Sequence, residues 1–152
     1  MLMQDVQEIQ CICRAEVAKL RGCSATTDHR NIMQVHLLKS KIHRAQVTAS
    51  SLHYEGSLTI AIDLMEKVGF LPFERVLCSN LANGERFETY VIPGERGSGA
   101  IILNGATAHL GEVGDRLTIM SYTFIDEALA KKWEPRVIVM GENGKIAQER
   151  GI

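Results

Sequence analysis

The chain has 152 residues, 45% of them hydrophobic and 23% charged, with a formal net charge of −1. This length suits one domain with its own core, and the near-neutral charge gives no basic footprint for nucleic acid or for an anionic membrane surface. No apolar run approaches the ~18 residues of a transmembrane helix, and the first residues lack the unbroken apolar stretch of a secretory signal. We therefore expect a cytoplasmic protein.

The first 32 residues differ in character from the rest. Apolar residues recur at steps of three and four between residues 4 and 20, which predicts an amphipathic helix, and Gly22 follows its end. Residues 24–31 are polar and unpatterned, as in a linker. We divide the chain into an N-terminal extension, residues 1–32, and a domain, residues 33–152. The extension is either a genuine helical segment or the product of a start codon assigned too early, and we favour the second interpretation.

Cys11, Cys13 and His29 raise the question of a metal site in this extension. Zinc sites usually separate their cysteines by two to four residues, whereas a single residue separates these two. Small apolar thiols in a reducing compartment are the simpler interpretation. We predict no metal.

From Met33 onward the pattern is mostly that of short strands joined by glycine turns. The expected strands, in chain order, cover residues 35–48, 58–60, 75–78, 86–92, 100–103, 115–122 and, last in the chain, 136–140. Short helices are expected at 63–68, at 106–110 (a helix or a turn) and near 126–133. Asn83-Gly84, a strong hairpin signal, lies between two of the strands. Many strands and few helices favour a mainly β fold, a small closed barrel, over an α/β sheet.

No standard nucleophile or nucleotide motif is present. There is no G-x-S-x-G elbow, and the glycine-rich segment 94–99 has neither Walker nor Rossmann spacing, so a β-turn is more plausible there than a phosphate cradle. Gly56-Ser57 is also a turn by default. Its alternative is self-cleavage, in which the Ser57 hydroxyl attacks the Gly56 carbonyl and replaces the amide by an ester. Elimination and hydrolysis would then leave a pyruvoyl group at position 57, and Gly56 would tolerate the strained backbone that the attack needs.

Six blocks of sequence distinguish between these two interpretations. They are Lys41-x-His43-Arg44-x-x-Val47-Thr48 and residues 52–57, 83–90, 95–98, 104–106 and 113–115. In this order they closely resemble the bacterial aspartate 1-decarboxylases, and the resemblance covers about residues 33–140. It implies a double-psi β-barrel with a few short helices, and active sites between the subunits of a homotetramer. It also implies decarboxylation of L-aspartate to β-alanine and CO₂ for pantothenate and coenzyme A biosynthesis, in some family members after the action of a maturation factor.

The resemblance implies a role for each matching residue. The pyruvoyl group derived from Ser57 forms a Schiff base with the substrate amine and acts as the electron sink that pyridoxal phosphate provides elsewhere. Gly56, Ser57 and Thr89 serve self-cleavage, Thr89 as a hydrogen-bond donor to the oxyanion. Tyr90 donates a proton to the carbanion, since a phenol keeps its proton at neutral pH. The implied substrate-binding residues are Lys41, Arg86, Thr89, Asn104, Gly105, Ala106 and Thr107.

Arg86 is expected to hold the side-chain carboxylate of aspartate, because clamping the leaving carboxylate would stabilise the ground state. At Thr107 the family often has alanine, so we expect the extra hydroxyl and methyl to narrow the pocket.

Alternatives remain for these assignments. From sequence alone, Lys41 and Arg86 could be surface charges and Tyr90 a half-buried strand aromatic, while His43 and His53 are expected to be pocket or structural residues, not catalytic ones. The whole chain could be a non-catalytic barrel that acts as a binding module. It could also be a related pyruvoyl decarboxylase with another amino-acid substrate, which the presence of Lys41 and Arg86 disfavours.

Overall fold

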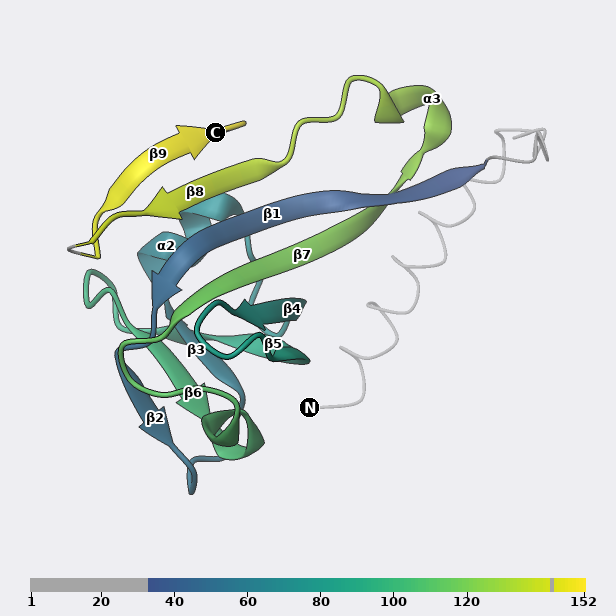
Figure 1. The fold of residues 1–152 in the computed structure, drawn as a ribbon. Helices are drawn as coiled ribbons and strands as arrows, with labels where there is room; N and C mark the ends of the chain where they lie inside the picture. Colours follow the sequence, from purple (N-terminus) through teal and green to yellow (C-terminus); the bar gives the residue numbers. More distant parts are fainter. Residues whose placement is uncertain (1–32, 143) are drawn as a thin grey trace, which may run out of the picture. The chain divides into compact units, whose positions relative to one another are not determined.

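The computed structural model describes residues 33–142 and 144–152. The expected helix at 4–20, the linker and the cysteine–histidine group at 11–29 lie outside these residues, and the assignment of 1–32 as an extension stays a prediction. The elements in chain order are β1 (Gln34–Gln46), β2 (Ala49–Ser51), β3 (Leu58–Ala61), α2 (Ile62–Val68), β4 (Arg75–Asn80), β5 (Arg86–Gly94), β6 (Ile101–Asn104), η2 (Gly105–His109), β7 (Arg116–Asp126), α3 (Glu127–Ala130), β8 (Arg136–Met140) and β9 (Ile146–Arg150) (Figure 1). The mainly β fold with a few short helices is confirmed.

The strands form one nine-stranded sheet in the order β2-β6-β3-β5-β4-β7-β1-β8-β9. Most neighbours are antiparallel, but β1 with β8, β2 with β6, and β3 with β5 are parallel. The long strands β1 and β7 run side by side, as Figure 1 shows, and their register shifts twice. One shift lies between Ile42 and Ala45, where Arg44 has a φ of 63°, so this irregularity bends the strand near Lys41 and His43.

The core forms because the inward-facing positions of these strands are apolar. On β3, β5 and β6, the paired residues Leu58, Val91 and Leu103 are completely buried. Side chains alternate between the two faces of a strand, so the residues on either side of these three point away from the core. This alternation decides which residues near Gly56-Ser57 share a face.

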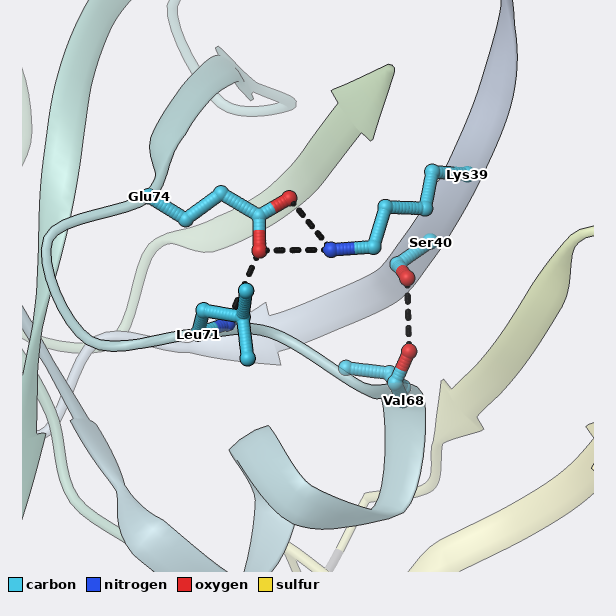
Figure 2. Close-up of polar contacts among 5 residues, drawn as sticks. All are labelled: Lys39, Ser40, Val68, Leu71 and Glu74. Atoms are coloured by element: carbon cyan, nitrogen blue, oxygen red, sulfur yellow. Dashed lines mark hydrogen bonds and ion pairs between the residues drawn. The ribbon is translucent and has the colours of Figure 1, made fainter. Parts of the chain in front are cut away.

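Two polar contacts attach β1 to the last residue of α2 and to the segment that follows it (Figure 2). The ammonium of Lys39 lies 2.8 and 2.7 Å from the two carboxylate oxygens of Glu74, and the Ser40 hydroxyl donates to the Val68 carbonyl over 2.6 Å. Glu74 also accepts from the backbone N–H of Leu71. The connection between α2 and β4 is therefore held in place against β1.

The strand and helix predictions are largely correct, with four differences. The strand predicted at 35–48 ends at Gln46, and the separate strand β2, which was not predicted, follows it. The 136–140 strand is confirmed, but the prediction that it is the last one is wrong, because β9 pairs with it in antiparallel fashion. The helix near 126–133 is limited to the four residues of α3, and β7 extends four residues past the predicted end at 122. The hairpin around Gly84 is confirmed, with a φ of 79° at this glycine. No helix of the described residues is long and apolar enough to cross a membrane.

Candidate active site

The Gly56-Ser57 bond lies where the chain crosses from one side of β6 to the other. β2 pairs with β6 on one side, with Ser51 opposite Asn104, and β3 pairs with β6 on the other side, with Leu58 opposite Leu103. Residues 52–57, which we call the 52–57 connection, join the two strands around the end of β6. At its end, the backbone N–H of Asn104 donates to the Ser57 carbonyl over 2.8 Å. This bond continues the β3–β6 register by one residue and fixes the position of Ser57.

Two glycines with positive φ angles meet at this bond. Gly56 has a φ of 150°, and a methyl group on its α-carbon would come within 2.5 Å of the Ile92 Cδ1 atom. Gly105, the first residue after β6, has a φ of 59°, and a methyl group there would lie 3.1 Å from the Gly56 carbonyl oxygen. Both positions therefore favour glycine, and the carbonyl group of Gly56 is packed against the backbone of Gly105.

Ser57 lies on the side of the sheet that faces away from the core. Leu58 faces the core, so Ser57 and Thr59 share the opposite face. In the parallel register, Leu58 is opposite Val91, which puts Ser57 level with Tyr90 on the adjacent strand. Ser57 is buried, whereas Tyr90 is 41% exposed. The predicted cofactor residue and the predicted proton donor therefore occupy neighbouring positions on one face.

Thr89 is adjacent to Tyr90 in sequence but alternates to the other face of β5. It pairs with Val76 of β4 and is half-buried. Continuing the β3–β5 register by two residues puts Gly56 level with Thr89. The backbone of Thr89 is thus near the bond of interest, while the role of its hydroxyl in cleavage stays a prediction.

Asn104 makes a hydrogen bond with each of its polar backbone groups and with its side-chain nitrogen. Besides the bond from its N–H to Ser57, its Nδ2 atom donates to the Thr59 hydroxyl over 2.8 Å. Its carbonyl accepts from the buried Thr107 hydroxyl over 2.9 Å. Thr107 therefore directs its hydroxyl back onto the η2 turn. Ala106, between them in sequence, is exposed.

Lys41 lies on β1, two residues before His43 and therefore on the same face of the strand. His43 exchanges a hydrogen bond with Thr118 of β7, with its Nδ1 atom 2.9 Å from the hydroxyl oxygen. Burial, together with the positive charges of Lys41, Arg44 and Arg150, lowers the pKa of the His43 imidazole.

Arg86 begins β5, opposite Ser79, and is exposed. It is on the same face as Tyr90 but four residues before it, which corresponds to about 13 Å along an extended strand. Within residues 33–142 and 144–152, neither Lys41 nor Arg86 has an ion pair or a hydrogen bond to the residues around Ser57. The structure thus brings together Gly56, Ser57, Tyr90, Asn104 and Gly105, and among the described residues neither cation is bonded to them.

His53, in the 52–57 connection, is exposed, and its role as a pocket or structural residue stays a prediction. In the part of the chain that the structure describes, no group of three or more histidine, cysteine, aspartate or glutamate residues could hold a metal ion.

Thr59 is the polar residue of this region that sequence reasoning missed. A threonine in a strand is ordinary, and the only signal was its spacing of two residues from Ser57, which puts both side chains on one face.

The domain is similar to known proteins over nearly all of its length. The family model described as aspartate decarboxylase matches residues 33–147. The aspartate 1-decarboxylase of Thermoanaerobacter pseudethanolicus is 52% identical over 113 residues, which cover 74% of this chain and 97% of that protein. The aspartate 1-decarboxylase of Carboxydothermus hydrogenoformans is 47% identical, over 76% of this chain and 91% of that protein. That of Burkholderia vietnamiensis is 50% identical, over 78% and 93%.

The family has a double-psi β-barrel fold, so the predicted fold class is confirmed in this respect as well. The matched region covers more than half of the sequence, and it contains every residue of the site described above. The chain therefore belongs to the aspartate decarboxylase family.

Proposed function

We propose that this chain is the precursor of a pyruvoyl-dependent aspartate 1-decarboxylase, a carboxy-lyase that converts L-aspartate to β-alanine and CO₂. The product would serve pantothenate and coenzyme A biosynthesis in the cytoplasm. The observation that carries the proposal is the packing of the Gly56 carbonyl against Gly105, with Ser57 held by the Asn104 N–H. An ordinary surface turn needs neither of these constraints.

Self-cleavage requires the Ser57 hydroxyl to attack the Gly56 carbonyl carbon. The C–N bond breaks as the new C–O bond forms, and the amide becomes an ester. Elimination then releases the Gly56 carboxylate and leaves a dehydroalanine at position 57, and water replaces its nitrogen, which leaves as ammonia. The φ of 150° at Gly56 supports this route, because a residue with a side chain would resist that backbone conformation.

The surroundings of Ser57 fit the pyruvoyl group on which the family depends. Ser57 is 7% exposed, so the group would be protected from bulk water, and its carbonyl is already bonded to the Asn104 N–H. The group supplies an electrophilic ketone that takes the substrate amine and withdraws electrons from the bond to the departing CO₂. Tyr90, level with Ser57 on the same face, is the proposed proton donor.

We assign substrate binding to the loop beside this group and to two cationic side chains farther from it. The loop of Asn104, Gly105, Ala106 and Thr107 would line the pocket. Lys41 and Arg86 would meet the carboxylates, with the planar guanidinium suited to bidentate capture. Because Arg86 lies about 13 Å along the strand from Tyr90, we propose that a second copy of the chain completes each site, as in a homotetramer.

The exposure of neighbouring side chains supports this assembly. Phe73 is 73% exposed, and its ring centroid is 6.4 Å from that of Tyr90. A pair of exposed aromatic rings beside the proposed site is the kind of surface that a second subunit covers. Cleavage itself could be unaided or could need a maturation factor.

The test is an assay of the purified protein with L-aspartate and, as the matched control, L-glutamate, which is longer by one methylene. We expect β-alanine from aspartate, little product from glutamate, and none with the Ser57→Ala variant. If another amino acid gave product and aspartate did not, the assignment of aspartate as the substrate would be wrong. A chain that stays intact and inactive even in the presence of cell extract would indicate the non-catalytic binding module.

A further inference from the structure

Arg150 of β9 lies on the same face of the sheet as Lys41 of β1. In the parallel register of β1 and β8, Lys41 is opposite Val137, and in the antiparallel register of β8 and β9, Val137 is opposite Arg150. Residues directly opposite each other on neighbouring strands point to the same face. The backbones of Lys41 and Arg150 are therefore two strand spacings, about 10 Å, apart, with both side chains on one face.

The residues on either side of Arg150 hold β9 in this orientation. The carboxylate of Glu149 lies 3.0 Å from the Nζ atom of Lys67 on α2, the helix whose buried residues belong to the core. A methyl group on Gly151 would come within 2.3 Å of the Pro135 carbonyl oxygen, so the backbone is tightly packed there. Because successive side chains of a strand alternate, Arg150 points away from α2 and to the outer face of the sheet.

The guanidinium of Arg150 extends from β9 toward β1. Burial is the main cause of the lowered pKa of the His43 imidazole, and the positive charges of Lys41, Arg44 and Arg150 add to it. The charge of Arg150 thus acts on a residue two strands away. Val137, on the strand between them, is only 7% exposed although it faces outward. Long cationic side chains on both sides can bury such an apolar residue under their stems while their charged ends meet above it.

No acidic neighbour balances these two cations. None of the ion pairs formed within residues 33–142 and 144–152 includes Lys41 or Arg150. The residues beside them on this face are uncharged, namely Met120, Val139 and Gln148. Like charges that face each other across a sheet are destabilising, and an anion between them would turn this repulsion into attraction.

We propose that Arg150 is a specificity-determining residue that binds, together with Lys41, one carboxylate of L-aspartate on this face. The inference rests on the proposed function, in which Lys41 meets a substrate carboxylate. Arg150 adds a planar guanidinium, which can donate two parallel N–H bonds to a carboxylate, whereas a lysine acts as a point charge. Two cations at one position favour a carboxylate over an uncharged group of the same shape.

Thermal unfolding with succinate tests this site without any turnover. Succinate has two carboxylates and no amino group, and sodium chloride at equal ionic strength controls for screening. Arg150→Gln removes one charge from the site, and Lys131→Gln, at the end of α3, removes an exposed charge elsewhere. Succinate should raise the Tm of the wild type and of Lys131→Gln equally, and that of Arg150→Gln by less than half as much. No rise in the wild type, or equal rises in all three proteins, would overturn the proposal.

Steady-state kinetics then connect the site to the reaction. All variants should cleave completely by mass spectrometry, because β9 is not adjacent to the strands that hold the Gly56-Ser57 bond. The KM for L-aspartate should rise about fivefold in Arg150→Gln with kcat unchanged, and Arg150→Lys, which keeps the charge, should lie between this variant and the wild type. An unchanged KM in Arg150→Gln, or a fall in kcat instead, would overturn the assignment.

A double-mutant cycle tests whether the two cations share one carboxylate. In a Lys41→Gln background, Arg150→Gln should have a smaller effect on KM than in the wild type, because the carboxylate is no longer held between them. Equal effects in both backgrounds would show that Arg150 acts only as a remote charge and would overturn the proposal. Failure of the proposed function is a different result, in which the wild type makes no β-alanine although succinate still stabilises it through Arg150.

Discussion

Replacing Gly105 with alanine tests the contact between the two glycines at the proposed cleavage bond. The added methyl would lie 3.1 Å from the Gly56 carbonyl oxygen, a separation that requires one of the two groups to move by a few tenths of an ångström. Gly105 also has a φ of 59°, which an alanine adopts at a cost of about 1–2 kcal/mol. The substitution therefore has two effects, one on stability and one on the position of the carbonyl group.

Gly84→Ala separates these two effects. Gly84 has a φ of 79°, but a methyl group there would meet nothing within 4 Å. The Gly84→Ala substitution should lower the free energy of unfolding by the same ~1–2 kcal/mol, which corresponds to a fall of roughly 3–10 °C in Tm, and it should leave the Gly56-Ser57 bond unaffected. A misplacement of 1 Å costs about 100-fold in the rate of an oriented reaction, so a few tenths of an ångström should slow cleavage by about three- to tenfold. Only Gly105→Ala should show this slowing.

The assay follows the fraction of intact chain over time after cell-free translation, with and without cell extract in case a maturation factor is needed. Thermal unfolding of the same two variants measures the stability cost. We expect similar losses of stability and a slower cleavage in Gly105→Ala alone. Equal cleavage rates in wild type, Gly84→Ala and Gly105→Ala would refute the contact as a determinant of cleavage. Slow cleavage in both variants would mean that the loss of stability, and not the contact with the Gly56 carbonyl, slows cleavage.

Three further predictions concern other residues. Tyr90→Phe should cleave normally but turn over aspartate at least about 100-fold more slowly, as measured by β-alanine release, and loss of cleavage would show that the role is misassigned. The bonds from Asn80 and from the Glu112 N–H lower the pKa of Asp115, so its contribution to stability is present above about pH 4 and is lost as the pH falls through the lowered pKa. Asp115→Asn should therefore be less stable than the wild type near neutral pH, with the gap closing in acid, as measured by denaturant unfolding. Burial raises the pKa of Cys78 to about 12, so its peptide should be alkylated by iodoacetamide only after denaturation, and labelling of the native protein would contradict the buried position.

Local patterns predicted most of the fold. Alternation of apolar residues identified the strands of the core, and Asn83-Gly84 identified the β4–β5 hairpin. The pattern failed for β9, because Ile146–Arg150 is mostly polar and lies exposed at the edge of the sheet. The pattern predicted a longer helix than the four residues of α3. Pro135 disfavours a helical conformation at the residue before it, and the Trp133 indole N–H donates to the Leu38 carbonyl of β1.

The site could be predicted only as a set of residues, not as an arrangement. Gly56-Ser57 and the Asn104 loop came from their resemblance to a family, because a Gly-Ser pair alone is a turn. The contact between Gly105 and the Gly56 carbonyl depends on the order β2-β6-β3, which brings distant segments together and leaves no local signal. Thr59 was missed for the same reason, since its importance comes from Asn104 on a neighbouring strand.

The central claim is that this chain cuts itself between Gly56 and Ser57 and makes its cofactor there. Intact-mass spectrometry of the purified protein, after incubation with cell extract, tests it most directly. We expect two fragments, one ending at Gly56 and one beginning at position 57 that is lighter by one ammonia than a fragment beginning with serine. A single intact chain, or a second fragment that begins with unmodified serine, would contradict it.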